Sequence, residues 1–186
     1  YIRPVAKLLN IDASVVKRIL LKNNIKINNL SYRKYNITES FFDKINTEEV
    51  SYMLGFLFAD GSISNKNYNI SICLSNKDQS ILEDFEKFIY NDNKTHITSY
   101  KSNQKPFNIY CKINFNSKYM VNRLVSLGCV QNKSLILKFP QEIIRSSEII
   151  QRHFIRGYFD GDGSINQKQK HFVITSTLDF CEKAKD

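Results

Sequence analysis

Alternation of apolar and polar residues marks two segments of the chain as half-buried β-strands. Residues 107–116 alternate most strictly, with Phe107, Ile109, Cys111, Ile113 and Phe115 opposite Asn108, Tyr110, Lys112, Asn114 and Asn116. Residues 68–75 place Ile70, Ile72 and Leu74 opposite Asn69, Ser71 and Cys73. The pattern predicts two strands with one face on an apolar core, and residues 171–177 (HFVITST) are predicted to form a further strand of a hairpin.

Helices are predicted where apolar residues recur at a spacing of three to four. Residues 80–89 and 117–128 are amphipathic, and Gly128 is expected to end the second helix. A third helix, with Thr47 as its expected N-cap, is apolar nearly all round, which indicates burial. Residues 181–186 have the pattern of the middle of a helix.

Residues 4–24 have the pattern of a helix-turn-helix, with apolar positions at Ala6, Leu8, Leu9, Val16, Ile19 and Leu20. Asn10 is expected in the left-handed conformation at the turn, and Ser14 as the N-cap of the second helix. Lys17, Arg18 and Lys22 on that helix would face phosphates or base edges of DNA. Any short helical hairpin has a similar pattern, so a purely structural hairpin is the alternative.

An internal repeat relates two stretches at a constant offset of 102 residues, such as Gly157 against Gly55. Residues 52–64 read YMLGFLFADGSIS, and residues 154–166 read FIRGYFDGDGSIN. The shared pattern of glycine, small residue, aspartate, glycine, serine and isoleucine indicates two copies of one structural unit.

Small residues lie four apart on one face of each repeated helix: Gly55 and Ala59 in the first copy, Gly157 and Gly161 in the second. Such a face lets two helix backbones approach closely, so we expect the two helices to pack against each other at the centre of the molecule. We expect Gly61 and Gly163 to end these helices in the left-handed conformation. Asp60 and Asp162 then meet at the two helix ends.

Two carboxylates at neighbouring helix C-termini repel each other and are disfavoured by both helix dipoles. A hard divalent cation such as Mg²⁺ relieves these conflicts, because it binds carboxylate oxygen. Asp60 and Asp162 are therefore predicted to be metal ligands. The alternative is a pair of Asp-Gly turns exposed to water.

The composition favours a polyanionic partner. The net charge is +9, and residues 1–36 contain eight basic residues and one acidic residue. General solubility is the alternative explanation of such a charge. The four cysteines contain no C-x-x-C pair, which argues against structural zinc and for reduced thiols in an intracellular protein. No apolar run is long enough to span a membrane.

On these residues the chain resembles the LAGLIDADG homing endonucleases. MLGFLFADG (53–61) and IRGYFDGDG (155–163) match the nine-residue signature of that family. Two copies in one chain resemble the single-chain, pseudosymmetric members, which implies a monomer. The resemblance implies an α+β fold of pseudo-twofold αββαββα repeats whose antiparallel strands form a saddle on DNA, here preceded by a small all-α helix-turn-helix.

The resemblance also implies an activity: site-specific hydrolysis of both strands of double-stranded DNA with Mg²⁺ or Mn²⁺, as in intron homing. The last acid of each signature carries the metal, which assigns Asp60 and Asp162, with Ala59 and Gly161 beside them in the metal site. Asp160, the first acid of the second signature, is not expected to be a ligand. Lys133, within LGCVQNKSLILKFP (127–140), matches a family lysine near the active site and is the third catalytic candidate. A surface lysine is the alternative.

The polar face of the predicted strands suits the base edges of a major groove, although an ordinary solvated sheet face has the same composition. The residues predicted to bind DNA are Lys17, Arg18, Lys22, Lys66, Asn69, Ser71, Asn108, Tyr110, Lys112 and Asn114.

The predicted organisation is a helix-turn-helix (1–24), a connector that lies along DNA (25–46), a first repeat (47–147) and the start of a second repeat (148–186). The chain begins with Tyr1, and the second copy continues for 24 residues beyond Asp162. We therefore expect the second repeat to be incomplete and the chain to be cut at both ends.

Three other classes of protein share some of these features. An intron RNA maturase or a non-catalytic DNA-binding regulator uses the same fold, although both acids are retained here. The endonuclease part of an intein is a further alternative, against which the absence of visible splicing blocks argues. A metal enzyme without a nucleic-acid partner is disfavoured by the basic N-terminal segment.

Overall fold

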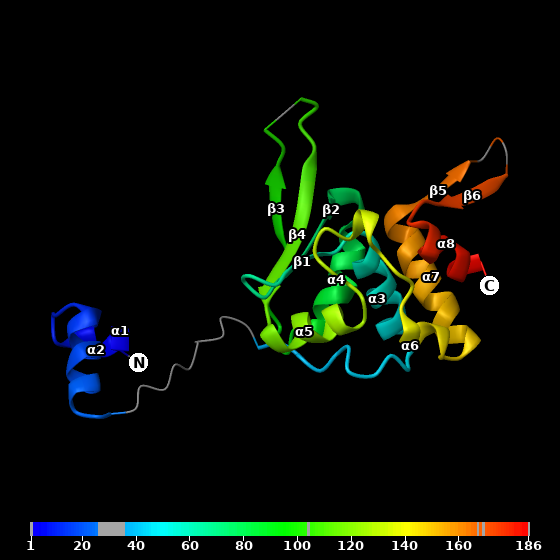
Figure 1. The fold of residues 1–186 in the computed structure, drawn as a ribbon. Helices are drawn as coiled ribbons and strands as arrows, with labels where there is room; N and C mark the ends of the chain where they lie inside the picture. Colours follow the sequence, from blue (N-terminus) through cyan, green and yellow to red (C-terminus); the bar gives the residue numbers. More distant parts are fainter. Residues whose placement is uncertain (1, 26–35, 104, 167, 169, 186) are drawn as a thin grey trace. The chain divides into compact units, whose positions relative to one another are not determined.

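The computed structural model describes residues 2–25, 36–103, 105–166, 168 and 170–185. The described residues fall into two compact units, one up to Ile25 and the other from Asn36 onward. Helices and antiparallel sheets make up the fold, which is of the predicted α+β class (Figure 1). Within the described ranges, no helix has the length and apolar character needed to cross a membrane.

The N-terminal unit is a pair of helices, α1 (Ile2–Leu8) and α2 (Ala13–Lys22). Asn10 has the left-handed conformation expected at the turn, with φ of 51°. The predicted N-cap is wrong: α2 begins at Ala13, so Asp12 takes this position, and its carboxylate accepts a 2.7 Å hydrogen bond from the Ser14 N–H. Ala6 and Val16 are buried between the helices, whereas the other predicted apolar positions are half-buried or exposed.

The larger unit contains two long central helices, two antiparallel sheets and several shorter helices. Its central helices are α3 (Glu48–Ala59) and α7 (Glu148–Asp162). Its remaining helices are α4 (Gln79–Ile89), α5 (Lys118–Ser126), α6 (Gln141–Ile144) and α8 (Leu178–Lys185), with 3₁₀ turns η1 (Asn76–Asp78) and η2 (Lys133–Leu135).

Four strands form the main sheet in the order β1-β2-β4-β3, and every neighbouring pair is antiparallel. They are β1 (Ser62–Ser64), β2 (Asn69–Ser75), β3 (Thr98–Lys101) and β4 (Ile109–Asn116). A separate hairpin, β5 (Gly163–Asn166) and β6 (His171–Ile174), follows α7. The two strands predicted by alternation are thus β2 and β4, which pair with each other at the centre of the sheet.

The inner face of the main sheet forms part of a single apolar core. Ile70 and Ile72 of β2 and Ile113 of β4 are buried there with apolar residues of α3, α4 and α5. The predicted apolar face of β4 holds only in part, because Phe107 and Ile109 are 50% and 53% exposed. They lie where the β3–β4 hairpin projects past the helices, so the alternation continues beyond the end of the core (Figure 1).

Three helix ends in this unit follow the sequence signals. Thr47 caps α3 by accepting a hydrogen bond from the Val50 N–H at 3.3 Å. Ser117 caps α5 by accepting from the Met120 N–H at 3.1 Å. Gly128 follows α5 with φ of 100°, a conformation that glycine adopts without strain. These residues therefore fix where the core helices start and stop.

The two signature helices approach so closely that backbone meets backbone. A Cβ atom added to Gly55 would lie 2.0 Å from the Phe154 carbonyl oxygen, and one added to Gly157 would lie 2.0 Å from the Tyr52 carbonyl oxygen. Because Phe154 is the repeat equivalent of Tyr52, the contact is reciprocal, as a pseudo-twofold axis requires. The prediction that these helices pack against each other is confirmed.

The same pseudo-symmetry holds at the opposite end of the helices. The Ser51 hydroxyl donates to the Ile150 carbonyl oxygen at 2.6 Å. The equivalent contact joins His153 Nε2 to the Glu48 carboxylate at 3.0 Å. A backbone acceptor in one half is thus replaced by a side-chain acceptor in the other, at matching positions of the repeat.

The close packing of α3 and α7 predicts whether a substitution at Gly157 raises or lowers stability. Gly157→Ala should lower the free energy of unfolding by about 2–4 kcal/mol, because its methyl group overlaps the backbone of α3. In a helix that lacked this contact, the same change would be stabilising by up to about 1 kcal/mol. Arg152→Ala, at an exposed position of α7, is the control and should change stability by about 0.5 kcal/mol or less. Urea denaturation measures both, and unchanged or raised stability of Gly157→Ala would contradict the packing.

Candidate functional site

Asp60 and Asp162 lie together where α3 and α7 end. Asp60 is the C-cap of α3, and Asp162 is the last residue of α7. A Cβ atom added to Gly161 would lie 2.5 Å from the Ala59 Cβ and 3.4 Å from Asp60 Oδ2. The close helix packing therefore continues to the ends of the helices and brings the two aspartates onto neighbouring backbones.

The expectation that Gly61 and Gly163 adopt the left-handed conformation is wrong. Gly163 is extended, with φ of −80°, and the φ angle of Gly61 is not positive either. Glycine is required for a steric reason instead. An added Cβ would lie 2.6 Å from the Leu57 carbonyl oxygen at Gly61, and 2.4 Å from the Phe159 carbonyl oxygen at Gly163. The chain leaves each helix so tightly that any side chain would collide with the last turn.

The electrostatics of the pair match two carboxylates forced together. Desolvation of its carboxyl raises the pKa of Asp60 to about 6, although the residue keeps an exposed surface. The negative charge of Asp162 adds to this increase in pKa, the ammonium group of Lys133 opposes it, and Asp78 in η1 adds a smaller contribution. Asp78, the last residue of η1, was not predicted to influence the site, because no motif in its sequence neighbourhood indicates a metal ligand.

Lys133 lies beside this pair, at the start of η2. Its ammonium group donates a hydrogen bond to the carbonyl oxygen of Gly61, the residue that follows Asp60. Asn132 precedes it in the left-handed conformation, with φ of 57°, and turns the chain toward α3. Lys133 is half-buried, so it places a positive charge next to the carboxylates and is not a free surface lysine.

Asp160, the other acid of the second signature, is used differently. Its carboxylate accepts a 2.9 Å hydrogen bond from the Tyr52 hydroxyl of α3 and lies 4.0 Å from Arg156 Nε. The guanidinium group of Arg156 lies over the Tyr52 ring. Asp160 thus connects α7 to α3 through Tyr52 at the side of the site.

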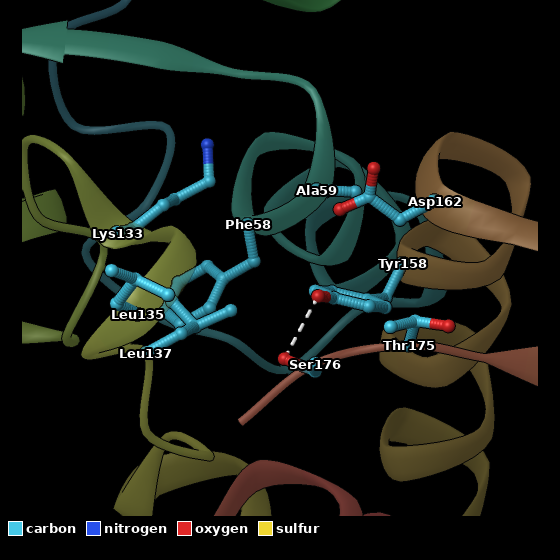
Figure 2. A pocket seen from close by; sticks show the side chains of 9 residues that line it. All are labelled: Phe58, Ala59, Lys133, Leu135, Leu137, Tyr158, Asp162, Thr175 and Ser176. Carbon is cyan, nitrogen blue, oxygen red and sulfur yellow. Dashed lines mark hydrogen bonds between the residues drawn. The ribbon is translucent and has the colours of Figure 1, made fainter.

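A cavity of about 490 Å³ opens beside Asp162. Figure 2 shows Lys133 and Asp162 on either side of the end of α3, which contributes Phe58 and Ala59. Tyr158 forms part of the floor, and its hydroxyl lies 3.0 Å from Ser176 Oγ. Burial raises the pKa of the Tyr158 hydroxyl above its ordinary value. Tyr158 and Ser176 were not predicted, because no motif in the sequence assigns a role to either: Tyr158 lies between the small residues of α7, and Ser176 follows β6.

The donor atoms at the helix ends fit a hard divalent cation. They are carboxylate and backbone oxygens, which Mg²⁺ and Mn²⁺ prefer over sulfur or imidazole ligands. Within the described ranges, no group of three or more His, Cys, Asp or Glu side chains is arranged to hold a metal. A cation bound by Asp60 and Asp162 would therefore complete its coordination with water, with backbone oxygens of residues such as Ala59 and Gly161, or with phosphate oxygens of a substrate.

The outer face of the main sheet is polar throughout. The strand register places on it Ser62, Ser64, Asn69, Ser71, Cys73, Ser75, Thr98, Tyr100, Tyr110, Lys112, Asn114 and Asn116. None of these residues is acidic. Lys66 is exposed in the β1–β2 turn, and Asn108 is exposed directly before β4. The predicted DNA-binding residues of this unit therefore gather on one sheet face and at its margins.

The remaining candidates belong to the N-terminal unit. Lys17, Arg18 and Lys22 are exposed on α2. They share that helix but not the compact unit that contains the aspartate pair. Their role in DNA binding stays a prediction.

Comparison with known proteins identifies the second signature region. Residues 150–183 match the family described as LAGLIDADG-like domain. This segment runs from the first turn of α7, through the β5–β6 hairpin, into α8. It contains Gly157, Gly161 and Asp162, which are the residues that pack against α3 and end beside Asp60.

Several curated proteins are similar to the chain over most of its length. The uncharacterized protein MJ0314 of Methanocaldococcus jannaschii is 27% identical over 184 residues, which cover 89% of this chain and 64% of that protein. A replication factor C small subunit of the same organism is 30% identical over 133 residues, 70% of this chain and 6% of that protein. A DNA polymerase of Acanthamoeba polyphaga mimivirus is 27% identical over 164 residues, 84% of this chain and 9% of that protein.

The chain spans less than two thirds of the length of each of these relatives. The family match falls on the second of two signature helices, and the first packs against it through the same small residues. On this evidence the second signature region is a LAGLIDADG-like domain.

Proposed function

We propose that this chain is the endonuclease part of a site-specific homing endonuclease, which hydrolyses both strands of double-stranded DNA with Mg²⁺ or Mn²⁺. The observation that carries the proposal is the pair of aspartates at the ends of α3 and α7, with Lys133 beside them. Two carboxylates held this close favour a bound cation, because the raised pKa of Asp60 reflects desolvation and repulsion that a cation would offset.

Each residue of the site has a definite part in such a reaction. Asp60 and Asp162 would hold the metal between the two helix ends, which occupy equivalent positions of the repeat. A bound divalent cation supplies an activated water and stabilises negative charge on the scissile phosphate. Lys133 would add positive charge next to the phosphate, while its hydrogen bond to the Gly61 carbonyl keeps its side chain beside Asp60.

The main sheet supports DNA as the substrate of this site. Its outer face offers hydroxyl, amide and amine groups and lacks acids, which suits a polyanion with base edges to contact. The net charge of +9 agrees with this partner. We propose that the sheet holds the duplex while the aspartate pair contacts its backbone.

A second candidate is that the chain is part of an element inserted into another protein. The similar segments make up 6%, 20% and 9% of three relatives whose names refer to replication factor C, RNA polymerase and DNA polymerase. A module that recurs as a small part of proteins with different names favours an inserted element, such as the endonuclease part of an intein. The chemistry proposed for Asp60 and Asp162 is common to both candidates.

The first prediction from this proposal concerns metal binding. Asp60→Asn and Asp162→Asn should each weaken binding of Mn²⁺ by roughly tenfold or more, because each removes a carboxylate ligand. Electron paramagnetic resonance titration of the full chain measures the free Mn²⁺. Asp160→Asn is the matched control: it makes the same change two residues from Asp162 and should alter Mn²⁺ affinity little. Equal affinities of all four proteins would refute the assignment of the ligands.

The second prediction concerns cleavage. Wild-type protein with Mg²⁺ should cut a plasmid library with a randomised insert at a recurrent sequence, which sequencing of the new DNA ends identifies. Asp60→Asn and Asp162→Asn should reduce this cutting by roughly a hundredfold or more, while both still bind the selected duplex. If either variant cuts as fast as the wild type, the proposed catalytic role of that aspartate is wrong.

The third prediction concerns pH and stability in the metal-free protein. The pKa of Asp60 is higher in the folded protein than in the unfolded chain, so folding is penalised wherever the carboxyl is ionised in the unfolded chain. The penalty is absent below about pH 4, grows between about pH 4 and pH 6, and stays constant above. Asp60→Asn should therefore raise the free energy of unfolding at pH 8 by about 1 kcal/mol, a value reduced for the solvent exposure of the residue.

The measurement is urea denaturation in the presence of EDTA at pH 4 and pH 8. At pH 4 the wild type and Asp60→Asn should differ little, because this pH is close to the pKa of the carboxyl in the unfolded chain and most of the penalty has not yet developed. Asp160→Asn should show no gain at pH 8. A stabilisation of Asp60→Asn that is the same at both pH values would show that ionisation of the Asp60 carboxyl is not its cause.

A further inference from the structure

Two asparagines on the outer face of the main sheet form a fixed pair across β2 and β4. Asn69 lies in β2 opposite Asn116, and Asn114 lies in β4 opposite Ser71, so Asn69 and Asn114 are diagonal neighbours on one face. The side-chain nitrogen of Asn69, Nδ2, donates to Asn114 Oδ1 at 2.6 Å and to the backbone carbonyl oxygen of Phe115 at 3.1 Å. The pair is thus anchored to the backbone of β4.

The anchor decides which way both amides point. The Phe115 carbonyl oxygen can only accept, so the Asn69 atom beside it must be the NH₂ group. The same NH₂ group faces Asn114, so the Asn114 atom that meets it must be an oxygen. Both NH₂ hydrogens of Asn69 are then used. Among the described residues, Asn69 Oδ1 and Asn114 Nδ2 have no protein partner, and they are the atoms left to contact a ligand.

The two remaining polar atoms are one acceptor, on Asn69, and one donor, on Asn114, whose side chains are joined by a hydrogen bond. In the major groove, adenine offers the complementary pattern on a single base, an N7 acceptor beside an N6 amino donor. Guanine offers two acceptors, N7 and O6, so it would leave Asn69 Oδ1 facing an acceptor. We infer that Asn69 and Asn114 act as one unit that reads adenine in the DNA contacted by this sheet, an inference that rests on the proposed function.

The surroundings of the pair support its use on a duplex. Neighbouring outward residues are Ser71 and Lys112, so the pair lies on a neutral to basic part of the face. Asn116 does not share the arrangement, since its Nδ2 donates to the Asn67 backbone carbonyl oxygen at 2.7 Å in the β1–β2 turn. The fixed acceptor and donor therefore belong to Asn69 and Asn114 and not to every asparagine of the face.

The test is selection of bound duplexes from a randomised DNA library by the full chain, without divalent metal so that no cutting occurs. Asn114→Asp keeps an acceptor for the Asn69 NH₂ group but turns the outward donor into an acceptor. At one position of the selected sequence, preference for adenine over the other bases should fall by roughly tenfold or more. Because Asp accepts hydrogen bonds from the cytosine N4 amino group, cytosine is the expected replacement.

Asn116→Asp is the matched control, since it adds the same charge two residues along the same strand. It should weaken binding as Asn114→Asp does but should leave the adenine preference intact. If Asn114→Asp changes no position of the motif selected by the wild type, or changes a position occupied by guanine or cytosine, the inference is wrong. The proposed function is unaffected by that result. A wild-type protein that selects no sequence at all overturns both.

Discussion

The reciprocal backbone contact between Gly55 of α3 and Gly157 of α7 is the constraint on which the rest of the structure depends. With side chains at these positions, the two helices would be pushed apart along their whole length, and Asp60 and Asp162 would separate. With glycine, the helix ends meet and their carboxylates share one environment, which is visible in the raised pKa of Asp60. The same contact thus explains both the fold of the central layer and the chemistry proposed for its end.

Much of this arrangement could be predicted because the sequence contains the same unit twice. The offset between the copies identified the helix pair and the aspartates, and alternation identified β2 and β4. The conformations of Gly61 and Gly163 could not be predicted, because a glycine required by steric crowding looks the same in sequence as one required by positive φ. Nor could alternation predict that Ile109 is exposed, since it gives the face of a residue but not the extent of the core.

The two copies of the repeat differ in one pair of side-chain contacts made by α3 and α7. In one half Tyr52 donates a hydrogen bond to Asp160, and at the equivalent positions of the other half Phe154 packs edge-on against Phe58, with ring centroids 5.3 Å apart. A hydrogen-bonded polar pair at the margin of the helix packing in one half thus corresponds to an aromatic pair in the core in the other half. In each pair, polar groups contact polar groups or apolar groups contact apolar groups. This accounts for the acid Asp160 in the second signature and for Phe58 at the equivalent position of the first.

The strands that follow the two helices are less alike than the helices themselves. Ile165 and Phe172 of the β5–β6 hairpin are 68% and 74% exposed, whereas the equivalent Ile63 and Ile70 of the main sheet are 3% and 0% exposed. The helix pair is nevertheless symmetric, because its closest contacts lie within α3 and α7 and involve no strand. The position of the aspartates is therefore set independently of the surface that would read DNA. Changes on the sheet face can then alter sequence preference without moving the carboxylates, provided that the glycine contact is kept.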